Sequence, residues 1–117
     1  MTRLLFLSTL LIVGCHQAAA DALTGEQLER ALVGHTWVWV SKKFESSGVT
    51  SYYRDGRIIV KVDGWGNRPE RGTWQIKGNQ ICITLVGNRE SCSKDISQID
   101  GDTLYSESTE TTFVRRD

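Results

Sequence analysis

The sequence has few of the residues that most often carry out chemistry. Its 117 residues include one proline, two histidines and three cysteines. After residue 20 the only histidine is His35, and the spacings HxH, HExxH and CxxC do not occur. We therefore expect no catalytic residue, no metal site and no cofactor, since a Ser-His-Asp triad would have to use His35. His35 directly follows a predicted helix, which favours a role at the end of that helix.

Neither sign of charge is in excess, and long apolar runs are missing. The chain has 14 basic and 14 acidic residues, no basic run longer than Arg115-Arg116 and no acidic tail. Binding to nucleic acid or to an anionic membrane surface is therefore not expected. The longest apolar stretch, residues 4–14, is shorter than the roughly 20 residues that a transmembrane helix needs, so we expect no transmembrane segment.

Residues 1–20 have the pattern of a signal peptide. Arg3 precedes the mostly apolar residues 4–14, and small residues follow. The sequence therefore predicts a signal peptide at 1–20 and a single small domain at 21–117. The expected location is the periplasm or the cell exterior.

Two processing sites are consistent with this segment. The run Ala18-Ala19-Ala20 before Asp21 is an A-x-A site, at which a signal peptidase would release a soluble protein. The run Ile-Val-Gly-Cys at 12–15 resembles a bacterial lipobox, in which Cys15 would be lipidated and would anchor the protein to the cell envelope. We favour cleavage after Ala20, because the alanine run is well placed, and keep the lipid anchor as the alternative.

Residues 23–34 are predicted to form the one helix. Thr24 is a suitable N-cap, and Gln27, three residues later, completes a capping box. Leu28 belongs to an apolar stripe at helical spacing, and Gly34 suits the position after the helix end. A helix of this length is not stable alone, so we expect it to lie on the sheet, with closure of one end of a barrel as one arrangement.

Residues 71–92 predict three strands joined by two tight turns. Gly78-Asn79 suits a two-residue type II′ turn, because glycine occupies the first central position. That turn places Trp74 opposite Ile83. We therefore expect Trp74 to be buried against Ile83.

The second turn of this region, centred on Gly87-Asn88, predicts a disulfide. A hairpin symmetric about Gly87 places Cys82 directly opposite Cys92, close enough for a bridge. An exported protein also reaches an oxidising compartment. The expected contribution to the free energy of unfolding is about 2–3 kcal/mol.

The remaining residues also alternate like strands. Residues 36–42 place Trp37 and Trp39 on one face, as in a core or the wall of a pocket. Residues 103–106 and 111–115 are predicted to close the sheet.

Asp55-Gly56 predicts a further hairpin. The dipeptide lies between residues 49–53 and 57–62 and suits a type I′ turn, which would place Tyr53 opposite Ile58. The total is seven or eight short strands. The chain is thus expected to be mainly β, a small antiparallel barrel or sandwich after one short N-terminal helix.

The order of these features resembles that of small secreted bacterial proteins with a lipocalin-like β-barrel, most of them of unknown function. A signal peptide and a short helix are followed by a Gly-x-x-Trp entry (Gly34, Trp37), a Tyr-rich strand with an Asp-Gly turn, a Gly-Thr-Trp strand at 72–74 and an Ile-Cys-Ile hairpin at 81–83. The resemblance implies a lipocalin-like barrel at 21–117 and an exported protein. It implies no catalytic residue.

Residues 63–71 form the most distinctive predicted loop. Trp65 stands between two glycines, near Arg68 and Arg71. Aromatic and arginine side chains in loops are typical contact residues, so these three are the candidate binding residues. The alternative is that Trp65 folds back and fills one end of the barrel.

The sequence favours an exported, non-catalytic binding or interaction protein, because no usable histidine or cysteine constellation is present. Its partner would be a small apolar ligand inside the barrel or an envelope protein, which includes inhibition of an exported enzyme. The alternative is a carboxylate-dependent hydrolase of the cell envelope, since any two of the 14 acidic residues could meet in space. A hollow apolar interior would support ligand carriage, and a filled one would shift attention to the outer surface.

Overall fold

The structure is a computed structural model, and it describes residues 21–117 except residues 67 and 88. The predicted signal peptide with both processing sites and Cys15 therefore lies outside the described residues, as does Asn88 of the predicted second turn. No helix among the described residues is long and apolar enough to cross a membrane.

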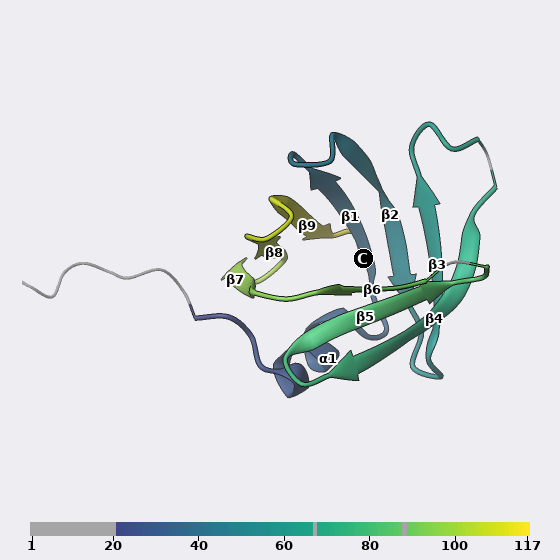
Figure 1. The fold of residues 1–117 in the computed structure, drawn as a ribbon. Coiled ribbons are helices and arrows are strands. Elements are labelled where there is room, and N and C mark those ends of the chain that lie inside the picture. The colour runs from purple at the N-terminus through teal and green to yellow at the C-terminus, as the bar shows by residue number, and fades with distance from the viewer. Residues whose placement is uncertain (1–20, 67, 88) are drawn as a thin grey trace, which may run out of the picture.

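The described residues form one helix and nine strands. They are α1 (Gly25–Leu32), β1 (Thr36–Ser41), β2 (Ser46–Tyr52), β3 (Arg57–Val62), β4 (Glu70–Lys77), β5 (Gln80–Leu85), β6 (Glu90–Ser93), β7 (Ile96–Asp100), β8 (Thr103–Ser106) and β9 (Thr111–Arg115). All strand pairs are antiparallel and belong to one sheet, which curls into a nearly closed barrel (Figure 1). The mainly β, antiparallel prediction is confirmed as a barrel, and β7 is a strand that the sequence pattern did not reveal.

The barrel has a seam between β6 and β7. The strand order β6-β5-β4-β3-β2-β1-β9-β8-β7 puts these two consecutive strands at opposite edges of the sheet. The segment before α1 covers part of the β7 edge, because Ala22 forms a bridge with Ser97 and the Leu23 N–H donates to the Ile96 carbonyl oxygen at 2.7 Å. Within the described residues, the β6 edge has no strand beside it.

The predicted caps of α1 are confirmed. The Thr24 hydroxyl accepts from the Gln27 N–H at 3.2 Å, and the Gln27 side chain accepts from the Thr24 N–H at 2.9 Å. After the helix, Gly34 adopts a φ of 84°, which suits glycine.

The helix lies across one end of the barrel, which we call the closed end; the opposite end is the open end (Figure 1). Leu28 and Leu32 of α1 are buried in the core, and the helix packs against β4 and β5. The Gly25 N–H donates to Asn79 Oδ1 at 2.9 Å, so the β4–β5 turn holds the start of the helix. Thus α1 both packs on the sheet and closes the barrel.

The register of the β4–β5 hairpin is the predicted one. Trp74 pairs with Ile83, and Gly78 has a φ of 60°, as the first central residue of a type II′ turn requires. However, the prediction that Trp74 is buried is wrong, because the ring is only partly buried. Its indole N–H donates to the Tyr53 carbonyl oxygen at 2.7 Å, and this bond holds the ring at the surface turn between β2 and β3.

The predicted disulfide is confirmed. Cys82 of β5 pairs directly with Cys92 of β6, and the two are bridged, with their Cα atoms 4.0 Å apart. Beside this bridge, Lys77 Nζ lies 2.9 Å from the carboxylate of Glu90. The bridge and this ion pair attach the edge strand β6 to the rest of the sheet.

The predicted register of the β2–β3 hairpin is wrong by one residue. Tyr52, not Tyr53, pairs with Ile58. The Tyr53 N–H donates to the Arg57 carbonyl oxygen, the Gly56 N–H donates to the Tyr53 carbonyl oxygen, and Gly56 has a φ of 95°. This is a three-residue loop ending in a left-handed glycine rather than the two-residue type I′ turn. Since side chains alternate along a strand, the shift puts Tyr52 inside the barrel and leaves Tyr53 exposed.

Candidate functional site

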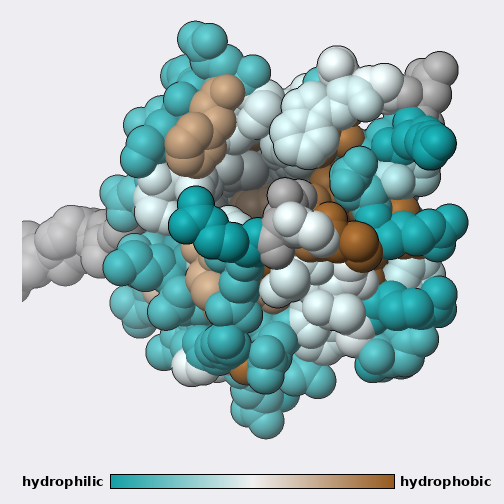
Figure 2. All heavy atoms as spheres, turned by 45° about the vertical axis from the view of Figure 1, so that its right-hand side comes forward, coloured by the Kyte–Doolittle hydropathy of each residue, from teal (hydrophilic) through white to brown (hydrophobic). Residues whose placement is uncertain are grey.

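The interior of the barrel is hollow. A cavity of about 390 Å³ is lined by residues of α1, of several strands and of the loops at the open end. Figure 2 shows a face of the molecule that is hollowed near its centre, with hydrophobic side chains beside the hollow and hydrophilic ones around it. The volume lies within the range of roughly 300–1,000 Å³ that is usual for small-molecule sites.

The lining is described in three layers from the closed end to the open end. The floor contains Leu32, Tyr52, Ile81, Ser93, Ile96 and Leu104. The middle layer contains Trp39, Thr50, Val60, Ile83, Ser91 and Phe113. The rim contains Ser41, Phe44, Ser46, Leu85, Arg89, Thr109 and Thr111. The lining is therefore mainly apolar below, whereas most of its side chains at the mouth are polar.

Two polar groups of the middle layer bond each other. The Trp39 indole N–H donates to the Thr50 hydroxyl at 2.9 Å. This bond satisfies both groups and leaves the ring of Trp39 as part of the apolar wall. Trp39 thus lines the pocket, as its strand pattern allowed, whereas Trp37 lies in the core with 2% of its surface exposed.

Trp37 borders a second and more polar cavity of about 310 Å³. Arg30 and Arg115 also line it, and each has a carboxylate partner, Glu26 and Asp102 respectively. The indole nitrogen of Trp37 is the one buried side-chain polar atom among the described residues that lacks a hydrogen-bond partner. Because that nitrogen is covered by protein atoms, it offers no donor to a ligand in this cavity.

Tyr52 supplies a phenol to the floor of the interior cavity, which Ser93 also lines. Its side chain is buried, and burial raises the pKa of its hydroxyl above the ordinary value, so the phenol stays neutral. No described residue makes a hydrogen bond to this hydroxyl. It is therefore free to bond a ligand or a water in the cavity.

Arg89 is the charged residue at the rim. It follows the β5–β6 turn, its side chain is exposed, and it has no ion-pair partner among the described residues. The carboxylate next to it in the sequence, Glu90, is paired with Lys77. Among the described lining residues Arg89 is the only one with a charge at neutral pH, and none is Asp, Glu, His or Cys.

Hydrogen bonds hold the other side of the rim in place. The Ser41 hydroxyl donates to the Thr109 carbonyl oxygen at 2.9 Å and accepts from the Phe44 N–H at 3.3 Å. The hydroxyls of Thr109 and Thr111 lie 2.7 Å apart. These bonds join the β1–β2 and β8–β9 loops, so the mouth has a defined shape without being filled.

The predicted contact loop lies outside the cavity. Trp65, Arg68 and Arg71 are all exposed, and 64% of the surface of Trp65 is accessible. The interpretation that Trp65 fills an end of the barrel is therefore wrong. The predicted loop 63–71 is too long by two residues, because Arg71 lies in β4 and pairs with Ile59. No hydrogen bond, ion pair or cation–π contact links the three side chains in the described residues, so they are not assembled into one site.

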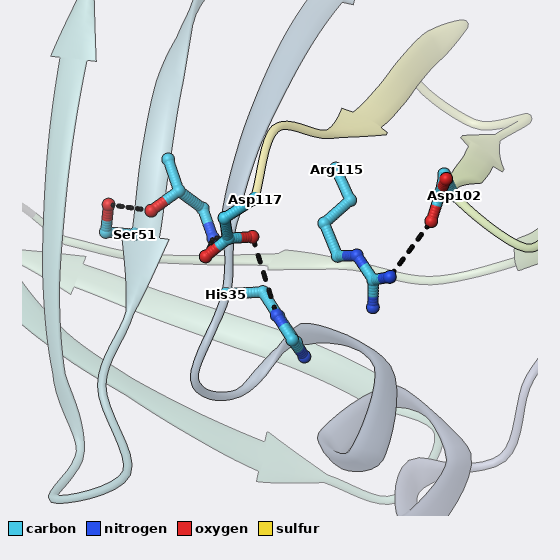
Figure 3. A network of polar contacts seen from close by, with 6 residues as sticks. His35, Ser51, Asp102, Arg115 and Asp117 are labelled. Carbon is cyan, nitrogen blue, oxygen red and sulfur yellow. Dashed lines mark hydrogen bonds and ion pairs between the residues drawn. The ribbon is translucent and has the colours of Figure 1, made fainter.

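The one histidine of the described residues takes part in a polar network away from the cavity (Figure 3). His35 Nδ1 lies 3.5 Å from Asp117 Oδ1, so the side chain links the start of β1 to the segment after β9. Its backbone N–H donates to the Leu32 carbonyl oxygen at the end of α1 at 3.3 Å. Desolvation raises the pKa of Asp117, but the bond from the Thr36 N–H and the charge of His35 outweigh it, and the pKa lies below its usual value. Ser51 bonds Thr36, not His35, so the Ser–His contact of a triad is not formed among these described residues.

One cluster of metal-ligating residue types exists in the described part of the chain. The ligand atoms of Cys82, Glu90 and Cys92 lie within 4.8 Å of one another. The two cysteines form the disulfide, and metal binding needs their thiolates. The predicted absence of a metal site therefore stays a prediction that this cluster does not contradict.

Sequence reasoning missed the residues that define the cavity, above all Tyr52, Arg89 and the rim hydroxyls. Only the alternation of Trp37 and Trp39 pointed to a pocket wall. No family of known proteins, no curated protein and no solved structure matches this chain.

Proposed function

We propose that this protein is an exported binding protein that holds a small, largely apolar ligand inside its barrel. The observation that carries this proposal is the hollow interior, about 390 Å³ in volume and mainly apolar over its floor and middle layer. A small protein that packed only for stability would fill such a space, because unfilled volume destabilises a core. An apolar cavity with a few directing polar groups is the usual form of a small-molecule site.

Three features support the exported, lipocalin-like part of the proposal. The sequence of residues 1–20 is typical of a signal peptide. The Cys82–Cys92 disulfide is of a kind that persists in oxidising compartments. The antiparallel barrel with a hollow centre has the architecture that the lipocalin-like resemblance implies.

A binding role is favoured over a carboxylate-dependent hydrolase. No acidic residue is among the described residues that line the cavity. A hydrolase that used two carboxylates would therefore have to work on the outer surface, where water has free access.

The test uses the neutral, polarity-sensitive dye Nile red and the exported protein purified with its disulfide intact. We expect saturable fluorescence enhancement at one site per molecule. Ile83→Trp should block it, because Ile83 lies in the middle layer and a larger ring would occupy the cavity. Thr84→Trp is the matched control, since Thr84 is the next residue of β5 and does not line the cavity. Absence of saturable binding, or equal binding by the folded Ile83→Trp protein, would contradict the proposal.

A second candidate is an interaction with an envelope protein through the loop at residues 63–69. The observation that favours it is the 64% exposure of Trp65, because large exposed aromatics are frequent contact residues. This function and ligand binding use different surfaces, and they can be tested separately.

A further inference from the structure

The cavity differs in polarity along its length. Its floor and middle layer present mainly aliphatic and aromatic carbon, and their polar groups, among them the hydroxyls of Tyr52, Ser91 and Ser93, are uncharged. Its rim presents the hydroxyls of Ser41, Ser46 and Thr109 and the guanidinium of Arg89. A ligand that matches both parts has an apolar body and a polar end that points to the open end.

The charge at the rim decides which polar end fits. Arg89 has no carboxylate partner among the described residues, and its neighbour Glu90 is already paired with Lys77. An arginine can bond an oxyanion through two parallel N–H groups. A cationic end would meet repulsion there, because no described lining residue is acidic.

The opposite orientation is unfavourable. A charged group at the floor would lie among Leu32, Ile96 and Leu104 without a counter-charge, and burying an unpaired charge is costly. The Tyr52 phenol is neutral at neutral pH, and burial raises its pKa further. The charged end therefore belongs at the rim, where solvent and Arg89 both reach it.

We propose that the ligand is a single-chain amphiphile with an oxyanion head group, held with its chain in the apolar cavity and its head against Arg89. This inference rests on the proposed function, since it assigns a ligand class to the same cavity. Both a carboxylate and a phosphate head have the required chemistry. They correspond to a free long-chain acid and to a phosphate-bearing lipid product, which the experiment below distinguishes.

The test measures displacement of Nile red by four matched probes below their micelle concentrations: dodecanoate, dodecyl phosphate, dodecanol and dodecyltrimethylammonium. We expect the better of the two anions to bind roughly 3- to 30-fold more tightly than dodecanol, because a charge-assisted bond at an exposed rim keeps only part of its strength. Whichever anion binds better identifies the source of the head group. The cation should bind most weakly, and the preference should fall with added salt.

Three variants assign the preference to a residue. Arg89→Gln should abolish the preference for anions and leave the affinity for dodecanol unchanged, and Arg89→Lys should keep part of the preference. Arg71→Gln is the control, because Arg71 is also exposed and does not line the cavity. Its preference should equal that of the unaltered protein.

The outcomes separate this inference from the proposed function. Equal binding of dodecanol and both anions, or a preference that survives Arg89→Gln, would overturn the head-group assignment while leaving the cavity as a ligand site. Failure of Nile red itself to bind would overturn the proposed function, and the inference with it.

Discussion

The closed and open ends of the barrel are built from the same strands but differ in what fills them. At the closed end the side chains of Leu28, Leu32, Ile58, Ile96 and Leu104 are at most 2% exposed. At the open end Phe44 is 62% exposed, and hydroxyl side chains and Arg89 surround an empty mouth. The difference indicates that α1 and the floor supply most of the packing, while the open end leaves the cavity accessible.

The open end is nevertheless ordered by polar contacts. Ser41 bonds both the Phe44 N–H and the Thr109 carbonyl oxygen, and the Lys42 N–H donates to the Glu110 carbonyl oxygen at 2.9 Å. Hydrogen bonds of this kind fix the geometry at a modest net gain in stability. One end thus depends on apolar burial, and the other on directional bonds that leave the space between them open.

The largest expected effect is at the closed end. Leu28→Ala should lower the free energy of unfolding by about 2–5 kcal/mol, because Leu28 is fully buried and the helix cannot collapse onto the space left behind. Phe44→Ala, at the rim, should change it by less than about 0.5 kcal/mol while weakening Nile red binding. Urea unfolding followed by fluorescence measures both. Equal destabilisation by the two changes would remove the contrast between the ends.

The next largest expected effect on stability concerns β6, the strand at one side of the seam. Reduction of Cys82–Cys92, or the double change Cys82→Ala with Cys92→Ala, should cost about 2–3 kcal/mol, because the bridge closes a loop of sequence separation 10 and attaches the edge strand β6. Since β6 also carries cavity residues, ligand affinity should fall as well. Thermal melts of oxidised and reduced protein, with and without Nile red, give both quantities. Two free thiols in the protein purified without reductant would show that the bridge does not form.

Sequence reasoning succeeded where a short motif sets the geometry by itself. The glycine of Gly78-Asn79 determined the turn and therefore the pairing of Trp74 with Ile83. The same logic gave the pairing of Cys82 with Cys92, and the Thr24 and Gln27 pair gave the start of α1. In each of these cases the relevant interactions span few residues.

Sequence reasoning failed where the outcome depends on how the whole sheet curls into the barrel. Asp55-Gly56 suits two loop lengths, and the structure has the longer one, which moves Tyr52 into the barrel. A cavity arises only when side chains from many strands meet, and no local pattern shows whether they leave space. The depth of Trp74 likewise depends on its bond to Tyr53 across a different hairpin.

The smallest expected effect on stability lies in the loop beside the open end. Trp65→Ala should leave the melting temperature nearly unchanged, because 64% of the side chain is exposed and it does not line the cavity. Nile red binding should also be unchanged, in contrast to Phe44→Ala. If the loop contacts an envelope protein, the same variant should lose capture of that partner from an envelope extract, whereas Lys61→Ala, at an exposed position on the neighbouring strand β3, should keep it. If Trp65→Ala instead lowered the free energy of unfolding by several kcal/mol, this ring would be packed on the barrel. The open end would then also contribute to the stability of the fold.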